Sequence, residues 1–353
     1  MKIKSVFLVV ITLFAIIISP RFDFAYAETF SPSQSQIVME KTSGRILSEF
    51  NADEKLPMAS TTKVITALTV IENFDLNTVI TVTEKTANVE GSSVYLKPDD
   101  KFTAEDLLYG LMLRSGNDCA ETLAVAVAGS IENFCEMMNE TAKKYGANNS
   151  SFKNPHGLPE KDHYTTARDL CNITRNALTN EIFAKIVSTK KYVATELVSG
   201  TKRTWYNKNK LLSSFGGADG VKTGYTKEAG KCYVGSATRN DMQLVCVLLN
   251  CPSTYDECKR LFDYAFKNYD FVKLIDKSKF DYRSFTKNGQ SVRLKINEDF
   301  YYPIKHGEKF TIEQNLPQIL PEGLQNDFPI GEIKIYGSKQ LIFSQKIYTL
   351  IDT

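Results

Sequence analysis

The 353-residue sequence lacks several features that would assign it to a specialised class of protein. It has no low-complexity tract and no long block of like charges, so we expect the chain to fold throughout. Its formal net charge is only +2, which is too close to neutral to indicate nucleic-acid binding by bulk charge. With three histidines and no C-x-x-C pair, a zinc site is not indicated, and we expect no metal and no cofactor.

The seven cysteines do not form a recognisable disulfide framework. Their number is odd, and the chain is far longer than a small scaffold held together by disulfides. Several lie in apolar helical contexts, where a small buried hydrophobic side chain is the simpler interpretation. One bridge among Cys246, Cys251 and Cys258 is left open by the sequence.

The longest apolar run lies at the N-terminus and resembles an export signal. Lys2 and Lys4 precede apolar residues 6–18, and Ala25-Tyr26-Ala27 places small residues where signal peptidase reads them. We therefore predict a signal peptide at residues 1–27 and an exported mature protein. An uncleaved anchor is the alternative, although the run is shorter than the roughly 20 residues of a spanning helix.

Hydrophobic patterns in the remaining chain predict an α+β domain followed by a β-rich domain. Strand patterns occur at 35–40, 45–50, around Lys222, at 232–237 and at 243–249. Helical spacing of apolar residues occurs at 62–74, 104–113, 118–128, 130–145, 166–179 and 255–268. Strands at both ends of this region predict one sheet built from both termini. Short alternating segments from residue 271 onward then predict domains at 28–270 and 271–353.

Ser60 and Lys63 precede an apolar stretch, residues 64–71, that predicts a buried helix. Residues three apart on a helix share a face, so the hydroxyl and the amine can come within hydrogen-bonding reach. A serine becomes a nucleophile when a base takes its proton, and a lysine kept neutral by burial or by a nearby cation can be that base. The same S-x-x-K spacing begins at Ser150, Ser188, Ser199 and Ser284. For a single S-x-x-K, an N-cap serine beside a solvated lysine is the simpler interpretation.

Two further motifs distinguish Ser60 from those rivals, because each occurs once and they follow in order. They are Ser115-Gly116-Asn117, between two predicted helices, and Lys222-Thr223-Gly224, on a predicted strand. Lys222 and Thr223 can hold a substrate that ends in a carboxylate. Ser115 can relay a proton to a leaving amine, while Asn117 can hold a substrate carbonyl and orient the lysine base. Loop, cap and edge-strand roles are the alternative for any one motif alone.

With these motifs in place, the chain resembles the low-molecular-mass penicillin-binding proteins, the serine D-Ala-D-Ala carboxypeptidases of the peptidase S11 family. The three motifs match the S-x-x-K, S-D-N and K-T-G set, with Gly116 replacing Asp. The likeness covers about residues 34–265. It implies a β-lactamase/transpeptidase-like catalytic domain, an antiparallel sheet with a helical subdomain, followed by a small all-β C-terminal domain. His156 and His163 match family positions that are not catalytic, so we expect structural roles for them.

The resemblance implies a serine acyl-enzyme mechanism. Ser60 would be the nucleophile and Lys63 its proton acceptor, assisted by Ser115 and Asn117. The reaction implied is cleavage of the terminal D-Ala-D-Ala bond of peptidoglycan stem pentapeptides, release of D-alanine, and hydrolysis of the acyl-enzyme by water. β-Lactams would acylate the same serine as substrate mimics.

Substrate binding is implied for the second half of the site. Lys222, Thr223 and Gly224 would bind the substrate carboxylate, and the backbone amides of Ser60 and Tyr225 would form the oxyanion hole. Family members often end in an amphipathic membrane helix that residues 346–353 are too short to form. We therefore expect location in the cell-wall region or on the outer face of the membrane, with membrane contact at most through an uncleaved signal segment.

Three rival functions share parts of this pattern. A class A β-lactamase uses a glutamate for deacylation, but its E-x-x-L-N pattern is absent between Asn117 and Lys222. An endopeptidase that cuts cross-links is not distinguished by these motifs. A non-catalytic wall-binding module would be expected to have lost at least one motif residue. The preferred stem peptide, the growth or sporulation stage and the oligomeric state are not encoded in readable form.

Overall fold

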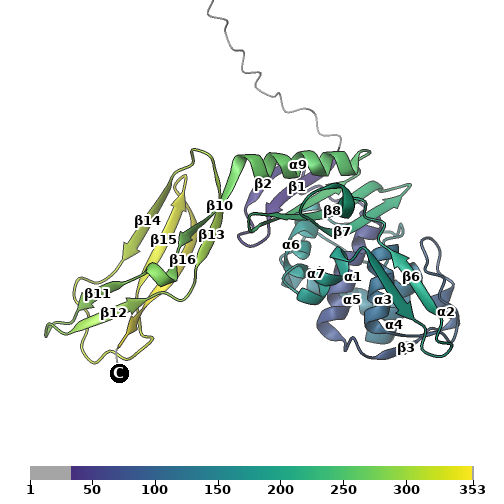
Figure 1. The fold of residues 1–353 in the computed structure, drawn as a ribbon, viewed down its shortest axis with the longest axis horizontal. Helices are drawn as coiled ribbons and strands as arrows, with labels where there is room; N and C mark the ends of the chain where they lie inside the picture. Colours follow the sequence, from purple (N-terminus) through teal and green to yellow (C-terminus); the bar gives the residue numbers. More distant parts are fainter. Residues whose placement is uncertain (1–32, 352–353) are drawn as a thin grey trace, which may run out of the picture. The chain divides into compact units, whose positions relative to one another are not determined.

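A five-stranded antiparallel sheet in the order β2-β1-β9-β8-β7 organises the first part of the computed structural model, which describes residues 33–351 (Figure 1). Its strands are β1 (Ser35–Glu40), β2 (Ile46–Phe50), β7 (Ala218–Thr226), β8 (Gly230–Arg239) and β9 (Met242–Leu249). Strands from both ends of this region meet where β1 pairs with β9, as the sequence predicts. The predicted signal peptide at 1–27 lies outside the described residues.

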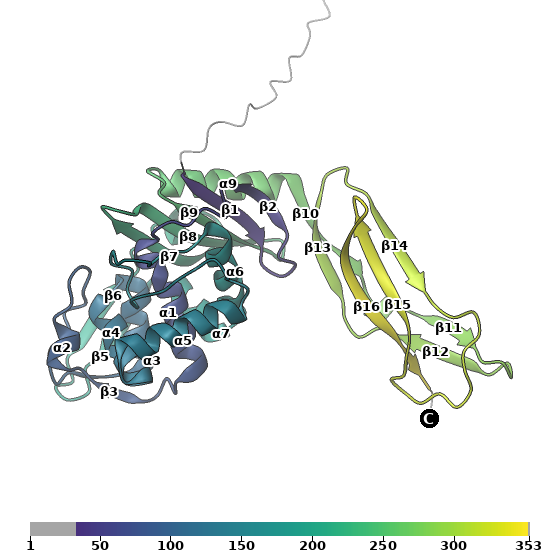
Figure 2. The same ribbon diagram turned by 180° about the vertical axis from the view of Figure 1, so that it is seen from behind.

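Helices cover both faces of this sheet because side chains alternate along each strand. On β9, Val245 and Val247 join the larger core beneath α1 (Lys63–Asn73), α6 (Ala167–Ala177) and α7 (Glu181–Ser188). Cys246 and Leu248 face the other way, toward α9 (Thr254–Asn268). Figures 1 and 2 show α9 on one face of the sheet and the other three helices on the opposite face.

The remaining helical elements pack around α1. They are η1 (Ala59–Thr62), α2 (Glu84–Ala87), α3 (Ala104–Tyr109), η2 (Gly110–Arg114), α4 (Asn117–Ala128), α5 (Ile131–Lys144) and α8 (Leu211–Ser214). Two hairpins accompany them: β3 (Val79–Thr81) with β4 (Lys101–Thr103), and β5 (Lys191–Thr195) with β6 (Lys202–Tyr206). Side chains of Thr103, Ser130 and Thr166 cap helix N-termini, which explains why polar residues begin the predicted helices.

The C-terminal region is all β apart from a short η3 turn (Lys277–Lys279). β10 (Tyr269–Ile275) pairs with β13 (Phe300–Lys305). A second sheet has the order β11-β12-β16-β15-β14, from β11 (Tyr282–Phe285), β12 (Ser291–Lys295), β14 (Phe310–Asn315), β15 (Pro329–Gly337) and β16 (Gln340–Leu350). Leu294, Ile333 and Ile347 belong to a separate buried cluster there. The predicted α+β class with an all-β C-terminal region is confirmed, while the boundary at residue 270 stays a prediction.

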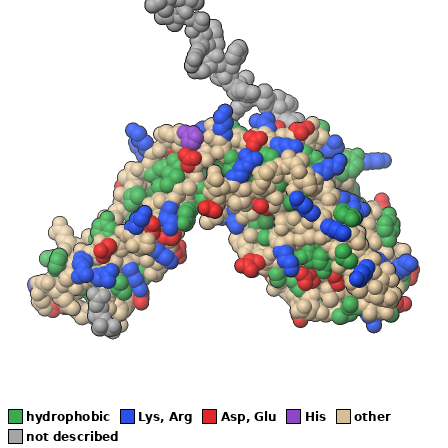
Figure 3. Space-filling view, viewed as in Figure 1, with side chains coloured by type: hydrophobic (Ala, Val, Ile, Leu, Met, Phe, Trp, Pro, Cys, Tyr) green, Lys and Arg blue, Asp and Glu red, His purple; other side chains and the backbone are tan. Residues whose placement is uncertain are grey.

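Several details depart from the sequence reading. Helix α7 and the β5–β6 hairpin were not predicted. All seven cysteines are buried and unpaired. Within residues 33–351, no helix combines the length and apolarity needed to cross a bilayer. Figure 3 shows basic and acidic side chains interspersed over the face in view, in keeping with the small net charge.

Candidate active site

Ser60 and Lys63 meet at the start of the most buried helix. Ser60 lies in the single turn of η1, and Lys63 is the first residue of α1, so the serine precedes the helix by one turn. The hydroxyls of Thr61 and Thr62 bond to the carbonyls of Met58 and Ala59 and hold this turn in place. Lys63 Nζ lies 3.1 Å from Ser60 Oγ, and the pair expected from the S-x-x-K spacing is formed.

The Lys63 amine has two further neighbours, both of them carbonyl oxygens. Its Nζ lies 2.7 Å from Asn117 Oδ1 and 2.7 Å from the backbone oxygen of His156. The side chain is fully buried. Among the described residues, no carboxylate hydrogen-bonds to this amine, so nothing offsets its burial by a direct ion pair.

Both lysines of the site have lowered pKa values. Burial is the main cause for Lys63, and the positive charge of Lys222 adds to it, so the pKa of Lys63 falls well below its ordinary value. Burial also lowers the pKa of Lys222 to about 7, with a smaller contribution from Lys208. At neutral pH, Lys63 is therefore the neutral member of the two.

Ser115 and Asn117 are presented by the junction between two helices. The wide π turn η2 ends at Ser115, whose φ of 66° is left-handed, and α4 begins at Asn117. Asn117 Nδ2 donates to the Glu90 carbonyl at 2.6 Å, and its backbone N–H donates to the Ser92 carbonyl at 2.7 Å. The amide is thereby oriented with its oxygen toward Lys63.

Strand β7 brings the third motif to the nucleophile from the edge of the sheet. A side-chain carbon on Gly224 would lie 3.0 Å from the backbone nitrogens of both Ser60 and Thr61, so only glycine permits this approach. Lys222 is 2% exposed, and its Nζ donates to the Thr223 carbonyl at 2.9 Å. Tyr225 follows with its side chain 65% exposed.

The predicted residues thus fall into two groups. Printed contacts bring together Ser60, Lys63, Asn117 and Gly224. Ser115 and Thr223 lie beside them in the chain, but within residues 33–351 their hydroxyls form no hydrogen bond to the other members.

The two buried histidines flank the nucleophile without contacting its hydroxyl. His163 Nε2 lies 3.0 Å from Thr62 Oγ1, its Nδ1 accepts the backbone N–H of Lys153, and burial lowers its pKa to about 4. His156 places its carbonyl, rather than its ring, on Lys63. This supports the expected structural roles.

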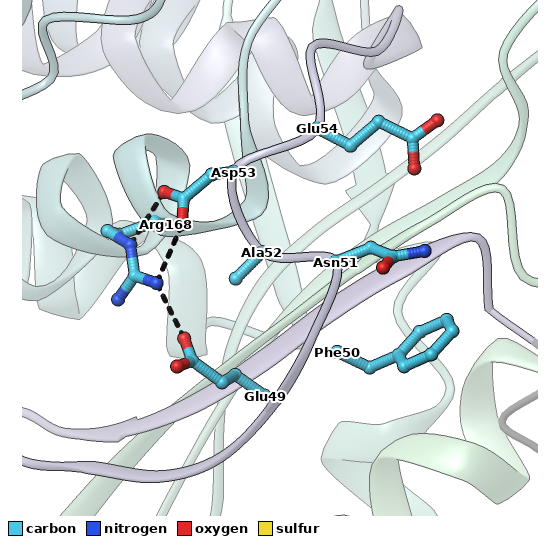
Figure 4. A pocket seen from close by; sticks show the side chains of 7 residues that line it. All are labelled: Glu49, Phe50, Asn51, Ala52, Asp53, Glu54 and Arg168. Atoms are coloured by element: carbon cyan, nitrogen blue, oxygen red, sulfur yellow. Dashed lines mark hydrogen bonds and ion pairs between the residues drawn. The ribbon is translucent and has the colours of Figure 1, made fainter.

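A surface pocket elsewhere on the same region contains none of the predicted site residues. Figure 4 shows Arg168 held by Asp53 and Glu49, with Phe50 and Glu54 also lining the pocket. Arg168 bonds both oxygens of Asp53, at 2.7 and 2.9 Å, and Glu49 at 2.7 Å. The charge of this arginine is satisfied within the protein, so we do not assign chemistry to the pocket.

Three contributors to the site were not identified from the sequence. The carbonyls of His156 and Glu90 hold Lys63 and Asn117, and Lys208 lies near Lys222. Backbone oxygens carry no residue signature, so no motif could reveal the first two. Lys208 is one of many lysines, and only the fold brings it to the site.

Comparison with known proteins gives consistent matches. Residues 25–253 match the model of the peptidase S11 family, described as D-alanyl-D-alanine carboxypeptidase. The chain is 31% identical over 293 residues to D-alanyl-D-alanine carboxypeptidase DacF of Bacillus subtilis, covering 80% of this chain and 75% of that one. It is 34% identical over 243 residues to DacB2 of Mycobacterium tuberculosis, covering 67% and 82%.

Solved structures extend the likeness beyond the catalytic region. Penicillin binding protein 5 from Haemophilus influenzae superimposes with a TM-score of 0.77 at 27% identity, over 91% of this chain and 97% of that one. A Streptomyces K15 DD-transpeptidase variant superimposes with a TM-score of 0.64 at 33% identity, over 67% of this chain and 98% of that one. The first match includes most of the β-rich tail, and the second stops short of it.

Proposed function

We propose, from the premise that this chain belongs to the D-alanyl-D-alanine carboxypeptidase family of serine peptidases, that its family activity is carried by Ser60, Lys63, Ser115, Asn117, Lys222, Thr223, Gly224 and Tyr225. The enzyme is a serine DD-carboxypeptidase that acts on peptidoglycan stem peptides, and β-lactam inhibition is expected of it. The observation that carries the residue assignment is the three-way environment of the Lys63 amine.

That environment suits a base rather than a cation. A neutral amine has two N–H groups and one lone pair, whereas an ammonium group has three donors and no acceptor. The carbonyls of Asn117 and His156 take two donors, which leaves the lone pair for the hydroxyl of Ser60. Lys63 then accepts the Ser60 proton as Oγ attacks the carbonyl carbon between the two D-alanines.

The leaving group needs a proton, and the acyl-enzyme needs water. Ser115 lies next to Gly116 at the junction that presents Asn117, and we assign it the relay of a proton from Lys63 to the amine of the departing D-alanine. Lys63 is then available again to take a proton from the water that hydrolyses the Ser60 ester. Free D-alanine and a shortened stem peptide are the products.

Binding and charge stabilisation come from β7. Lys222, with Thr223, holds the terminal carboxylate of the substrate, which supplies the charge partner that burial otherwise withholds from this lysine. The close approach of Gly224 to Ser60 brings the next amide, that of Tyr225, toward the Ser60 amide. We assign these two backbone N–H groups to the oxyanion hole.

Export and location complete the proposal. Residues 1–27 act as a signal peptide, and the enzyme works outside the cytoplasm, in the wall region or on the outer face of the membrane. The family names of the relatives support this location, because their substrate lies there. Domains at 28–270 and 271–353, and roles in cell shape, belong to the same proposal.

The deciding measurement is release of free D-alanine from diacetyl-Lys-D-Ala-D-Ala by the purified mature chain, with a penicillin-treated sample beside it. We expect release that penicillin blocks, and a labelled penicillin attached to Ser60. Ser60→Ala should abolish both turnover and labelling, and survival of either would refute the nucleophile assignment. A cross-linked dimeric muropeptide as second substrate distinguishes endopeptidase activity, and rapid turnover of penicillin itself would indicate a β-lactamase.

A further inference from the structure

The turn Asn154–Leu158 is wedged between the nucleophile segment and helix α4. Its Pro155 carbonyl accepts the hydroxyl of Thr66 at 2.7 Å, and its His156 carbonyl accepts Lys63 Nζ at 2.7 Å. Gly157 has φ +90°, and a side-chain carbon there would lie 1.9 Å from the Ala59 carbonyl oxygen. The position of this turn therefore sets where one of the two carbonyl acceptors of Lys63 lies.

The ring of His156 connects that turn to α4. Nδ1 accepts the backbone N–H of Leu158 at 3.2 Å, so the proton of the neutral ring is on Nε2. Nε2 lies 3.4 Å from Glu121 Oε1, and the histidine is 8% exposed while the glutamate side chain is 18% exposed. Burial lowers the pKa of His156, and the contact with Glu121 opposes that shift only in part, which favours the neutral ring. Lys63 and Glu160 are the other charged groups that act on the ring.

Glu121 shares one face of α4 with Asn117, because the two residues are four apart. Asn117 Oδ1 is the other carbonyl acceptor of Lys63. The helix thus holds both acceptors at once, one through its own Asn117 side chain and one through the Glu121 contact to His156. Any movement of the turn away from α4 would separate the two oxygens that orient the amine.

We propose that Glu121 is a positioning residue for the reaction: it holds the His156 ring so that the His156 carbonyl fixes Lys63 with its lone pair on Ser60. The inference rests on the proposed role of Lys63 as the base. Glu121 contacts neither the nucleophile nor the substrate path through β7, and its effect is on acylation rather than on binding.

The test compares Glu121→Met, which keeps the bulk but removes the acceptor, with Glu121→Gln, which keeps an acceptor oxygen. Because a small misplacement of a catalytic group slows the chemical step, we expect Glu121→Met to lower kcat and the rate of acylation by labelled penicillin about tenfold, with KM for the peptide little changed. Glu121→Gln should restore most of the rate. Glu136→Ala, at an exposed position on α5, is the matched control and should behave as wild type.

A double-mutant cycle tests whether the effect passes through the histidine. His156→Ala keeps the carbonyl but loses the ring, so the double variant with Glu121→Met should be no slower than the slower single variant. Additive losses, or a Glu121→Met enzyme with unchanged kcat, would overturn the inference. Equal losses in the Met and Gln variants would also overturn it. Thermal unfolding of each variant separates misfolding from misplacement, and a wild-type chain that releases no D-alanine would refute the proposed function instead.

Discussion

The region before residue 270 and the β-rich region after it bury very different side chains. Among the described residues, the first buries two lysines, two histidines and several carboxylates, whereas the second buries Thr286 and Thr349 as its only polar side chains. Burying a charge costs free energy unless it is paired, so such groups persist where they perform chemistry. The contrast locates the reactive machinery in the first region and leaves the second with a conventional apolar core.

The largest test of this contrast is Lys63→Met. The substitution replaces a buried amine by an apolar side chain of similar length, so we expect kcat/KM to fall about 10³-fold through loss of the general base. The free energy of unfolding should stay equal or rise, because an unpaired buried amine is removed. D-alanine release and thermal unfolding measure the two quantities, and a clear loss of stability would contradict the view of Lys63 as a functional burden.

Gly157→Ala tests the packing around the nucleophile. The added carbon would meet the Ala59 carbonyl at 1.9 Å, and the residue has a left-handed φ, so the turn or the Ser60 segment must move. We expect kcat/KM to fall about 100-fold, in line with the effect of a displacement near 1 Å. Gly200→Ala, at a left-handed glycine with open space around it, is the control and should leave the rate unchanged. Full activity of Gly157→Ala would show that the turn does not position the site.

The pH profile tests the role of Lys222. Its folded-state pKa of about 7 lies below its ordinary value of 10.5, so the free enzyme loses this proton as the pH rises through 7. Carboxylate binding needs the charged form, and kcat/KM should therefore fall about tenfold for each pH unit above that point. Lys222→Met should be slower and lack this alkaline limb. An unchanged limb in the variant would assign the titration to another group.

The same shift predicts a stability effect. Between pH 7 and 10.5 the unfolded chain binds more protons at this position than the native protein does, so the free energy of unfolding of the wild type rises with pH. The difference in Tm between wild type and Lys222→Met should shrink from pH 7 to pH 9. A constant difference would indicate that Lys222 titrates normally.

Ile335→Ala has the smallest expected effect on activity. Ile335 is fully buried in the C-terminal cluster, and its truncation should lower the free energy of unfolding of that region by roughly 2–5 kcal/mol. D-alanine release should not change. Ile65→Ala, in α1 beside Lys63, is the matched change in the first region and should reduce both stability and rate. Loss of activity in Ile335→Ala would link the two regions functionally.

Much of the fold followed from hydrophobic spacing, because α1, α4 and α9 each bury one apolar face and their starts carry capping residues. The β5–β6 hairpin did not, since its alternation is interrupted by lysines and by the exposed turn around Gly200. Within the site, the spacing of Ser60 and Lys63 predicted their contact. The His156 carbonyl and the Glu121 partner of its ring could not be predicted, because both depend on how a loop packs against a helix distant in sequence.

The wide turn of η2 has a consequence for how the sequence can change. Such a turn contains one residue more than the α-helix that it continues. Deleting one residue from Gly110–Arg114 would let ordinary α geometry continue, and everything beyond it would rotate by about 100° around the helix axis. Ser115 and Asn117 would then point away from Lys63 with every motif letter still present. In evolutionary terms, the length of this segment is as much a part of the active site as the residues it carries.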